Sequence, residues 1–259
     1  MTNTTHRGHG GAGGKQMKPM DPGAVGCGTT EYKEVAWIND YFLKMTKWND
    51  ASDYYGRTVN QNLVNIVNNV NRVAKWSDIN VSHHFNAFNG KATGAEVWYY
   101  LGDAKGRALA EKVSAVISKA LGIPNRGAKS TTNLYVVSNT VGTTILIEWA
   151  FVDNTSDMNK WNANKVRAVN AVLEVLGYKT NTQGSDKPMK YHTQANRYYE
   201  VIENSCTLYK GPSFKEKYWG YYTKGSQLWI SEVKKVGSAY MGKHCSGWVS
   251  MGDRYLKPA

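Results

Sequence analysis

The stretch Val81-Ser82-His83-His84-Phe85-Asn86-Ala87 determines how the rest of the chain is interpreted. Its β-branched and aromatic residues predict the end of a β-strand. Because side chains along a strand alternate between two faces, His83 and His84 must point to opposite sides of the sheet. Neutral imidazole is a common metal ligand, so one of them could face a cleft while the other packs. On its own, however, a paired histidine is equally well explained by packing, and a metal site needs partners elsewhere.

Outward from this stretch, helical and extended patterns alternate along the chain. Residues 1–30 are rich in glycine and are expected to hold little regular structure. Apolar residues at helical spacing predict four helices. The first begins at Glu31, and the other three cover about 60–75, 104–121 and 164–176. Extended patterns predict three further strands, at 95–100, 134–138 and 143–148. This alternation is typical of an α/β sheet flanked by helices.

Three residues outside the His83-His84 pair also deserve a functional interpretation. His9 lies in Gly8-His9-Gly10-Gly11, where small neighbours let the backbone approach whatever His9 holds. Glu31 begins a helix, where an acid is common because it complements the helix dipole. Glu148 ends an otherwise apolar strand. Because a buried carboxylate is costly unless it is paired, Glu148 is expected to be paired or to lie at a functional cleft.

The composition changes after Leu176. Residues 177–195 are polar and typical of a linker, and Asp186-Lys187-Pro188 lies within them. Short aromatic and β-branched runs follow at 198–202, 218–222, 228–233 and 247–250, which predict a small all-β barrel. The expected organisation is therefore a domain at 1–176, a linker at 177–195 and a second domain at 196–259.

The chain has 259 residues and a formal net charge of +12, which favours a polyanionic partner. Residues 177–259 carry 13 Lys and Arg against 6 Asp and Glu, so the smaller part is the denser in positive charge. Nucleic acid, an anionic membrane and an anionic cell wall all fit this charge. Nucleic-acid binding is disfavoured because no recognised nucleic-acid-binding motif is found.

Neither a secretion signal nor a membrane span is expected from the sequence. The first 20 residues lack an apolar core, and the apolar run Ile145–Val152 is short and interrupted by Glu148. Synthesis in the cytoplasm is therefore expected. Three cysteines are too few for a disulfide framework, and free thiols are expected, although a Cys206–Cys245 bridge is an open alternative.

Five motifs together resemble the zinc-dependent N-acetylmuramoyl-L-alanine amidase family of the Amidase_3 type. They are Gly8-His9-Gly10-Gly11, Asp21-Pro22-Gly23-Ala24-Val25-Gly26, Glu31, Ser82-His83-His84-Phe85-Asn86-Ala87, and Leu146-Ile147-Glu148 with Phe151-Val152-Asp153-Asn154. The resemblance covers about residues 1–176 and implies that His9, Glu31 and His84 bind Zn²⁺ and that Glu148 is catalytic. It implies hydrolysis, by zinc-activated water, of the amide bond between N-acetylmuramic acid and L-alanine in peptidoglycan. The chain departs from the family in two places: residues 1–7 are polar, and residues 12–20 look inserted.

The C-terminal part is similar to bacterial SH3-like (SH3b) cell-wall-binding domains, through Thr207–Ser213, Lys224-Gly225-Ser226 and Ser246-Gly247-Trp248-Val249. The combination resembles a phage endolysin that acts on the wall of a Gram-positive host and leaves the cytoplasm through a holin. Its expected partners are peptidoglycan and anionic wall polymers, without nucleic acid or membrane insertion. A bacterial autolysin, or a non-catalytic wall-binding protein that keeps the fold, are the alternatives.

Overall fold

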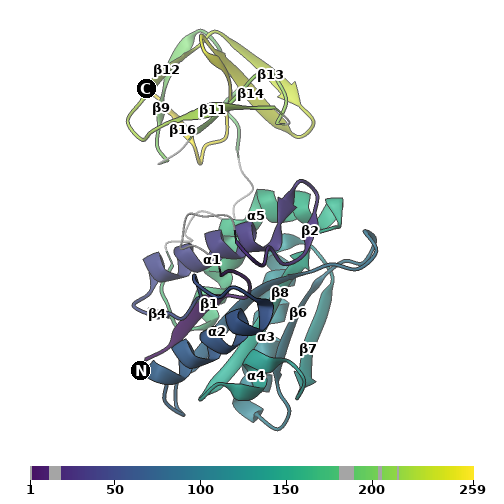
Figure 1. The fold of residues 1–259 in the computed structure, drawn as a ribbon. Coiled ribbons are helices and arrows are strands. Elements are labelled where there is room, and N and C mark those ends of the chain that lie inside the picture. The colour runs from purple at the N-terminus through teal and green to yellow at the C-terminus, as the bar shows by residue number, and fades with distance from the viewer. Residues whose placement is uncertain (1, 12–18, 181–189, 204–205, 215) are drawn as a thin grey trace. The chain divides into compact units, whose positions relative to one another are not determined.

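The fold is taken from a computed structural model that describes residues 2–11, 19–180, 190–203, 206–214 and 216–259 (Figure 1). The chain divides into two compact units, Met1–Thr180 and Asn181–Ala259. The linker expected at 177–195 lies partly outside the described residues. Within the described ranges, none of the helices combines the length and the apolar character needed to cross a bilayer.

The first unit is built on a six-stranded mixed sheet, which confirms the predicted α/β class (Figure 1). In spatial order its strands are β4 (Asn49–Asp50), β1 (Thr4–Arg7), β5 (Ile79–Asn86), β8 (Thr143–Phe151), β6 (Ala95–Tyr100) and β7 (Asn125–Thr131). Strands β4, β1, β5 and β8 are parallel, whereas β6 runs antiparallel to β8 and carries β7 parallel to itself. A small hairpin, β2 (Val25–Gly26) and β3 (Thr29–Thr30), lies outside this sheet.

Helices cover both faces of the sheet. On one face, α1 (Glu31–Met45), α3 (Ala104–Leu121) and α5 (Thr155–Val175) pack their apolar sides against the strands. This is the main core, in which Phe42, Val113 and Trp161 are buried together with the apolar residues of β5 and β8. On the other face, α2 (Val59–Val73) and the short α4 (Tyr135–Asn139) bury Ile66, Val67 and Val136 against each other.

Two expectations for this unit are wrong, and one strand was not predicted. The residues expected as a strand at 134–138 form α4, because Val136 and Val137 bury their side chains on the helix-covered face instead of pairing with a strand. The strand that does occur there, β7, was not predicted, since Asn125–Thr131 is a largely exposed edge strand with no apolar alternation. Helix α5 begins at Thr155, not near Asn164, because Asn154 caps its N-terminus by accepting from the backbone N–H groups of Ser156 and Asp157.

Within residues 1–30, where little regular structure was expected, strand β1 was not predicted, because it is fully buried and yet has no apolar side chain. The hydroxyl groups of Thr4 and Thr5 are satisfied by hydrogen bonds with Asn80 and Asn39. On the face of the main core, the indole of Trp149 donates to Nδ1 of His83 (3.3 Å), so the His83 proton lies on Nε2 and is donated to Oγ1 of Thr5 (2.9 Å). The Thr5 hydroxyl in turn donates to Oδ1 of Asn39 on α1 (2.8 Å). A buried polar chain therefore joins β8, β5, β1 and α1.

His83 is held neutral in this chain. Burial lowers its pKa well below the ordinary value, and the nearby His6 and His84 act in the same direction. The side chain of His83 therefore belongs to the packing of the sheet, on the face opposite to that of His84.

The second unit is all β and has its own core. A five-stranded sheet, in the order β11-β10-β15-β14-β13, accompanies a three-stranded one, β12-β9-β16. Their bounds are β9 (Arg197–Val201), β10 (Cys206–Tyr209), β11 (Lys217–Tyr222), β12 (Gln227–Ile230), β13 (Glu232–Val236), β14 (Ala239–His244), β15 (Gly247–Ser250) and β16 (Leu256–Pro258). Tyr199, Leu228, Ile230 and Val249 are among its buried residues. The run expected at 228–233 is two strands, not one, whereas Cys27, Cys206 and Cys245 are free thiols as expected.

The polar chain through Thr5 predicts a specific stability effect. Thr5→Val keeps the shape of the side chain but leaves the His83 N–H and Asn39 Oδ1 buried without a partner, which should lower the free energy of unfolding by about 1–3 kcal/mol. Thr5→Ser keeps the hydroxyl and loses one methyl group, so it should cost only about 1 kcal/mol. Urea unfolding of both variants measures the difference, and a valine variant as stable as wild type would contradict the polar chain.

Candidate metal centre and active site

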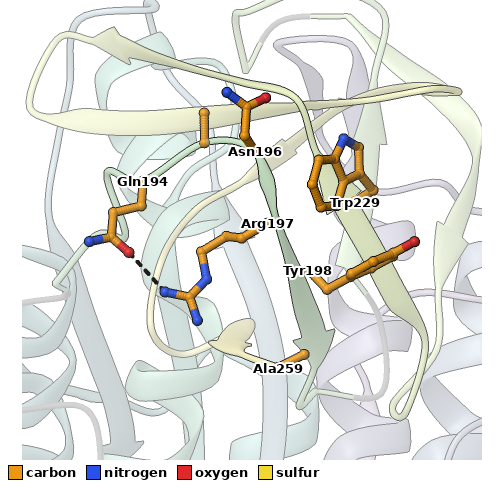
Figure 2. A pocket seen from close by; sticks show the side chains of 7 residues that line it. Gln194, Asn196, Arg197, Tyr198, Trp229 and Ala259 are labelled. Carbon is orange, nitrogen blue, oxygen red and sulfur yellow. Dashed lines mark hydrogen bonds between the residues drawn. The ribbon is translucent and has the colours of Figure 1, made fainter.

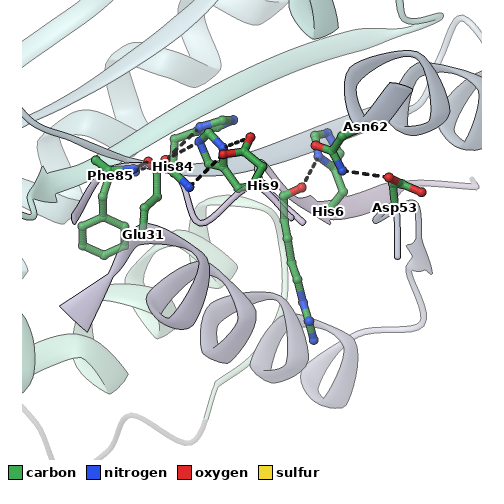
Figure 3. Close-up of polar contacts among 11 residues, drawn as sticks. His6, His9, Glu31, Asp53, Asn62, His84 and Phe85 are labelled. Atoms are coloured by element: carbon green, nitrogen blue, oxygen red, sulfur yellow. Dashed lines mark hydrogen bonds and ion pairs between the residues drawn. The ribbon is translucent and has the colours of Figure 1, made fainter. Parts of the chain in front are cut away.

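His9, Glu31 and His84, the three residues expected as metal ligands, converge at one edge of the sheet (Figure 3). Glu31 Oε1 lies 3.1 Å from His9 Nε2 and 3.0 Å from His84 Nδ1. One ligand atom from each side chain can be chosen so that all three lie within 4.8 Å of one another. The three residues come from the loop after β1, the start of α1 and strand β5, so the fold itself brings them together.

Glu31 is fixed in place by the backbone around it. It is the first residue of α1, after the N-cap Thr30, and its side chain is buried. Its Oε1 accepts the N–H of Phe85 (2.9 Å), the residue after His84, and its Oε2 accepts the N–H of Ala24 (2.9 Å). The carboxylate therefore ties the helix to β5 and to the turn at residues 21–24.

Two glycines make room for this cluster. A Cβ at Gly8 would lie 2.0 Å from Nε2 of His84, and one at Gly23 would lie 2.5 Å from Oε2 of Glu31. Gly23 also has a φ of +63°, a conformation that other residues rarely adopt. Gly8 lies close to Nε2 of His84, and Nδ1 is the ring nitrogen that faces Glu31.

Asp21 supports the cluster from behind, a role that was not assigned to it from the sequence. Its Oδ2 lies 2.7 Å from Nδ1 of His9, while its Oδ1 accepts the N–H of Gly23 (3.0 Å). A carboxylate on the far nitrogen of a histidine fixes the ring and its tautomer, as is usual behind metal-binding histidines. The aspartate of the Asp21-Pro22-Gly23 turn was the available signal.

The charges of the cluster are strongly coupled. Burial alone would lower the pKa of His9, but the carboxylates of Asp21 and Glu31 outweigh it and raise that pKa to about 10. Burial would raise the pKa of Glu31, yet the hydrogen bonds with His84 and His9 hold it well below the ordinary value. The pKa of His84 is lowered, mainly by burial. An anionic carboxylate thus sits between two imidazole nitrogens, an arrangement that attracts a cation.

Glu148 lies beside this cluster on the neighbouring strand. It is in register with His84, so the two side chains point to the same face of the sheet. Burial, followed by the charges of Glu31 and Glu96, raises its pKa well above the ordinary value. Within the described part of the chain, its buried Oε2 atom has no hydrogen-bond partner. A buried carboxylate oxygen without a partner is costly, which makes Glu148 a candidate for contact with a bound molecule.

Glu148 does not end its strand, as the sequence analysis expected. Strand β8 continues to Phe151, with a bulge: His84 is paired with Glu148 and Asn86 with Phe151, so β8 carries one extra residue. Bulges of this kind occur next to active sites because they redirect side chains. The irregularity explains how apolar packing resumes at Trp149 and Ala150 directly after the carboxylate of Glu148.

The donor set fits zinc. Two imidazole nitrogens and one carboxylate oxygen are a common catalytic zinc set, and zinc–ligand bonds of about 2.0–2.2 Å place ligand atoms roughly 3–4 Å apart. The distances of 3.0 and 3.1 Å at Glu31 Oε1 agree with this spacing. Gly8 and Gly23 leave room for the three candidate ligands, Asp21 holds the ring of His9, and Glu148 lies beside them with a buried Oε2 that has no partner among the described residues. These are features expected of a catalytic metal centre.

Comparison with known proteins points in one direction. Residues 6–178 match the family described as N-acetylmuramoyl-L-alanine amidase. A curated relative, an uncharacterized cell wall amidase of Bacillus anthracis, is 36% identical over 116 residues, which are 39% of this chain. The match spans 22% of that relative's length.

Solved structures give the same fold for the first unit. The catalytic domain of the CD27L endolysin targeting Clostridia Difficile is 25% identical, with a TM-score of 0.56, and the match covers 69% of this chain and 98% of that domain. Cwp6 from Clostridium difficile is 26% identical, with a TM-score of 0.54 over 68% of this chain and 29% of its own.

The role of Asp21 gives a prediction that does not depend on catalysis. Asp21→Asn removes the charge behind His9 and should weaken zinc binding by about 10–100-fold, the usual effect of losing such a partner. The dissociation constant, measured by competition with a chelator, checks this. Glu111→Gln, at an exposed position on α3, is the control and should bind zinc as wild type does. Equal affinities for the two variants would contradict the assignment.

Proposed function

The chain belongs to the N-acetylmuramoyl-L-alanine amidase family, and from this membership we propose that it is a zinc-dependent peptidoglycan hydrolase. His9, Glu31 and His84 would hold the metal, and Glu148 would be the catalytic residue. The bond cut is the amide between the lactyl group of N-acetylmuramic acid and the L-alanine of the stem peptide. The observation that carries the proposal is the position of Glu148, in register with His84 and with a buried oxygen that has no partner among the described residues.

Zinc, when bound, would acidify a water molecule and polarise the scissile carbonyl. Glu148 would take a proton from the attacking water as its oxygen adds to the carbonyl carbon. It would then deliver that proton to the nitrogen as the C–N bond breaks. The products are the free carboxyl group of the muramic acid and the free amino group of L-alanine.

The pKa of Glu148 suits this shuttle. In the metal-free chain, burial and the neighbouring carboxylates favour its protonated form, while His9 and Lys129 act in the opposite direction. A raised pKa makes a carboxylate a stronger base, which favours its accepting a proton and returning it in the next step. Asp21 and the backbone N–H of Phe85 would orient the ligands without entering the reaction.

The second unit is proposed to be an SH3-like domain that binds the cell wall. It is all β, and residues 177–259 carry 13 Lys and Arg against 6 Asp and Glu. An open pocket of about 650 Å³ lies on it, and Figure 2 shows Tyr198, Trp229 and Arg197 around this pocket. Tyr198 and Trp229 are 52% and 42% exposed, with ring centroids 5.0 Å apart. Exposed aromatic rings beside a guanidinium are suited to stack on and hydrogen-bond to a wall polymer.

A catalytic and a wall-binding unit in one chain suit a phage endolysin acting on a Gram-positive host, with release from the cytoplasm through a holin. The likeness of the first unit to the catalytic domain of the CD27L endolysin supports this source, and a bacterial autolysin is the alternative, since Cwp6 from Clostridium difficile is similar to the same degree.

The catalytic assignment predicts a separation between rate and binding. Glu148→Gln keeps the shape but cannot accept a proton, so the rate should fall by about 10²–10⁴-fold. Zinc content and thermal stability should stay near wild type. The assay follows new amino termini released from purified walls. A structural glutamate would instead lose stability, and a glutamate that binds the metal would lose zinc. New reducing sugars in place of amino termini would make the protein a glycosidase.

The wall-binding assignment predicts that one exposed tryptophan matters and another does not. Trp229→Ala should weaken sedimentation of the full chain with Gram-positive walls about tenfold, the effect of losing an aromatic contact worth about 1–2 kcal/mol. Trp76→Ala, at a position 84% exposed on the first unit, is the matched control. Higher salt should weaken binding if the positive charge contributes. If both variants sediment as wild type does, the pocket is not the wall site.

A further inference from the structure

A second charged cluster lies next to Glu148, on the side away from the proposed metal ligands. Glu96 on β6 is paired directly with Glu148 on β8, so both side chains lie on the same face. Glu96 is only 4% exposed. Its Oε2 accepts from Nε of Arg126 and from Nζ of Lys129, both at 2.6 Å. Two cations thus share one carboxylate, which leaves a net positive charge beside Glu148.

The second carboxylate oxygen of Glu96, Oε1, has hydrogen-bond donors of its own and does not depend on either cation. Its Oε1 already accepts from Asn86 Nδ2 (3.1 Å) and from the indole of Trp98 (3.2 Å). The carboxylate therefore acts as an anchor that holds two cationic side chains at a defined place on the sheet. Arg126 and Lys129 are only partly covered, with side chains 37% and 32% exposed.

The backbone of β7 directs Arg126 to this place. Ala95 pairs with Asn125 and Glu96 with Gly127, so Arg126 is the extra residue of a bulge. Gly127 has a φ of +81°, which supports the irregular backbone. The guanidinium carbon lies 5.1 Å from the ring centroid of Phe151, and only Nε is used by Glu96. The terminal nitrogens of Arg126 have no hydrogen-bond partner among the described residues and remain able to bind an anion.

The space continues beyond the cations. Lys129 is in register with Trp98 and its Nζ lies 5.2 Å from the centroid of a Trp98 ring. Trp98 also lines a pocket of about 440 Å³, with Leu101, Leu134 and the polar residues 130–133. A chain that leaves Glu148 in this direction would therefore pass the two cations and then an apolar and hydroxyl-lined pocket.

We propose that Arg126 and Lys129 form a subsite for the carboxylate on the second residue of the stem peptide, so that the enzyme favours D-glutamate over its amide there. This inference rests on the proposed amidase function. Adjacent strands are about 4.8 Å apart, so the cation heads at Glu96 lie roughly one strand spacing beyond Glu148. An extended residue spans at most about 3.6 Å. The carboxylate of the residue after L-alanine is about two residue lengths along the peptide, so it lies about 7 Å from the scissile nitrogen. The two spacings are compatible, and the guanidinium and ammonium groups are the donors that carboxylates bind most strongly.

The test uses the zinc-loaded full chain and two muropeptides that are identical except at the second residue, D-glutamate in one and D-isoglutamine in the other. Wild type should have a kcat/KM about tenfold or more higher for the acid, the effect of one charge-assisted hydrogen bond. Lys129→Met should bring the ratio close to one by raising KM for the acid, whatever change in kcat the two substrates share through the effect of Lys129 on Glu148. Lys129→Arg should keep most of the preference, and Arg126→Gln should reduce it.

The control is Lys112→Met, at an exposed position on α3, which should leave both rates unchanged. If wild type cuts both substrates equally, or if Lys129→Met slows both by the same factor, the cations only hold Glu96 and the subsite is wrong. If wild type releases no amino group from either muropeptide or from whole walls, the proposed function fails, and the subsite fails with it.

Discussion

The architecture of the site depends on one buried carboxylate, that of Glu31. It accepts backbone N–H groups from Ala24 and Phe85 and lies within hydrogen-bonding distance of both His9 and His84. Through these contacts the first turn of α1 fixes the loop after β1, the turn at 21–24 and the end of β5. A negative charge at a helix N-terminus is favoured by the helix dipole, so the same residue is suited to begin the helix and to attract a cation. The position of the site in the fold follows from this double role.

The two faces of strand β5 differ: one packs in the main core and the other faces the candidate site. His83 faces the main core, where it is neutral and hydrogen-bonded to Trp149 and Thr5. His84 points to the opposite face, where it approaches Glu31 and where the side chain of Glu148 also lies. The polar row on the second face continues across β8 and β6 to Glu96, where two cations end it. One sheet thus carries a line of ionisable side chains on one face, while its other face packs in the main core around His83 and Thr5. Such a line is stable only because each charge has a partner or a task.

Much of this arrangement was predictable from the sequence, for identifiable reasons. The period-two alternation at His83-His84 predicted that they face opposite sides, and the apolar stripes predicted α1, α2 and α3 closely. Strand β1 was not predicted because its residues, Thr4 to Arg7, have no apolar pattern. Their burial depends on hydrogen-bond partners distant in sequence. Strand β7 and helix α4 were not predicted because tertiary contacts, not local propensity, decide their conformation. Asp21 and Glu96 look like ordinary surface acids until the fold places His9 and two cations beside them.

The position of β1 has a consequence for how the protein is made. Strand β1 lies between β4 and β5, which both follow it in the chain, so Thr5 can pair with Asp50 and Val81 only after those strands have been synthesised. Contacts so distant in sequence form late, because the intervening chain must first be closed into a loop. His9 follows β1 directly, so the ligand cluster is assembled only when the centre of the sheet is complete. A chain synthesised only as far as β1 therefore lacks the cluster of His9, Glu31 and His84, because that cluster also needs α1 and β5.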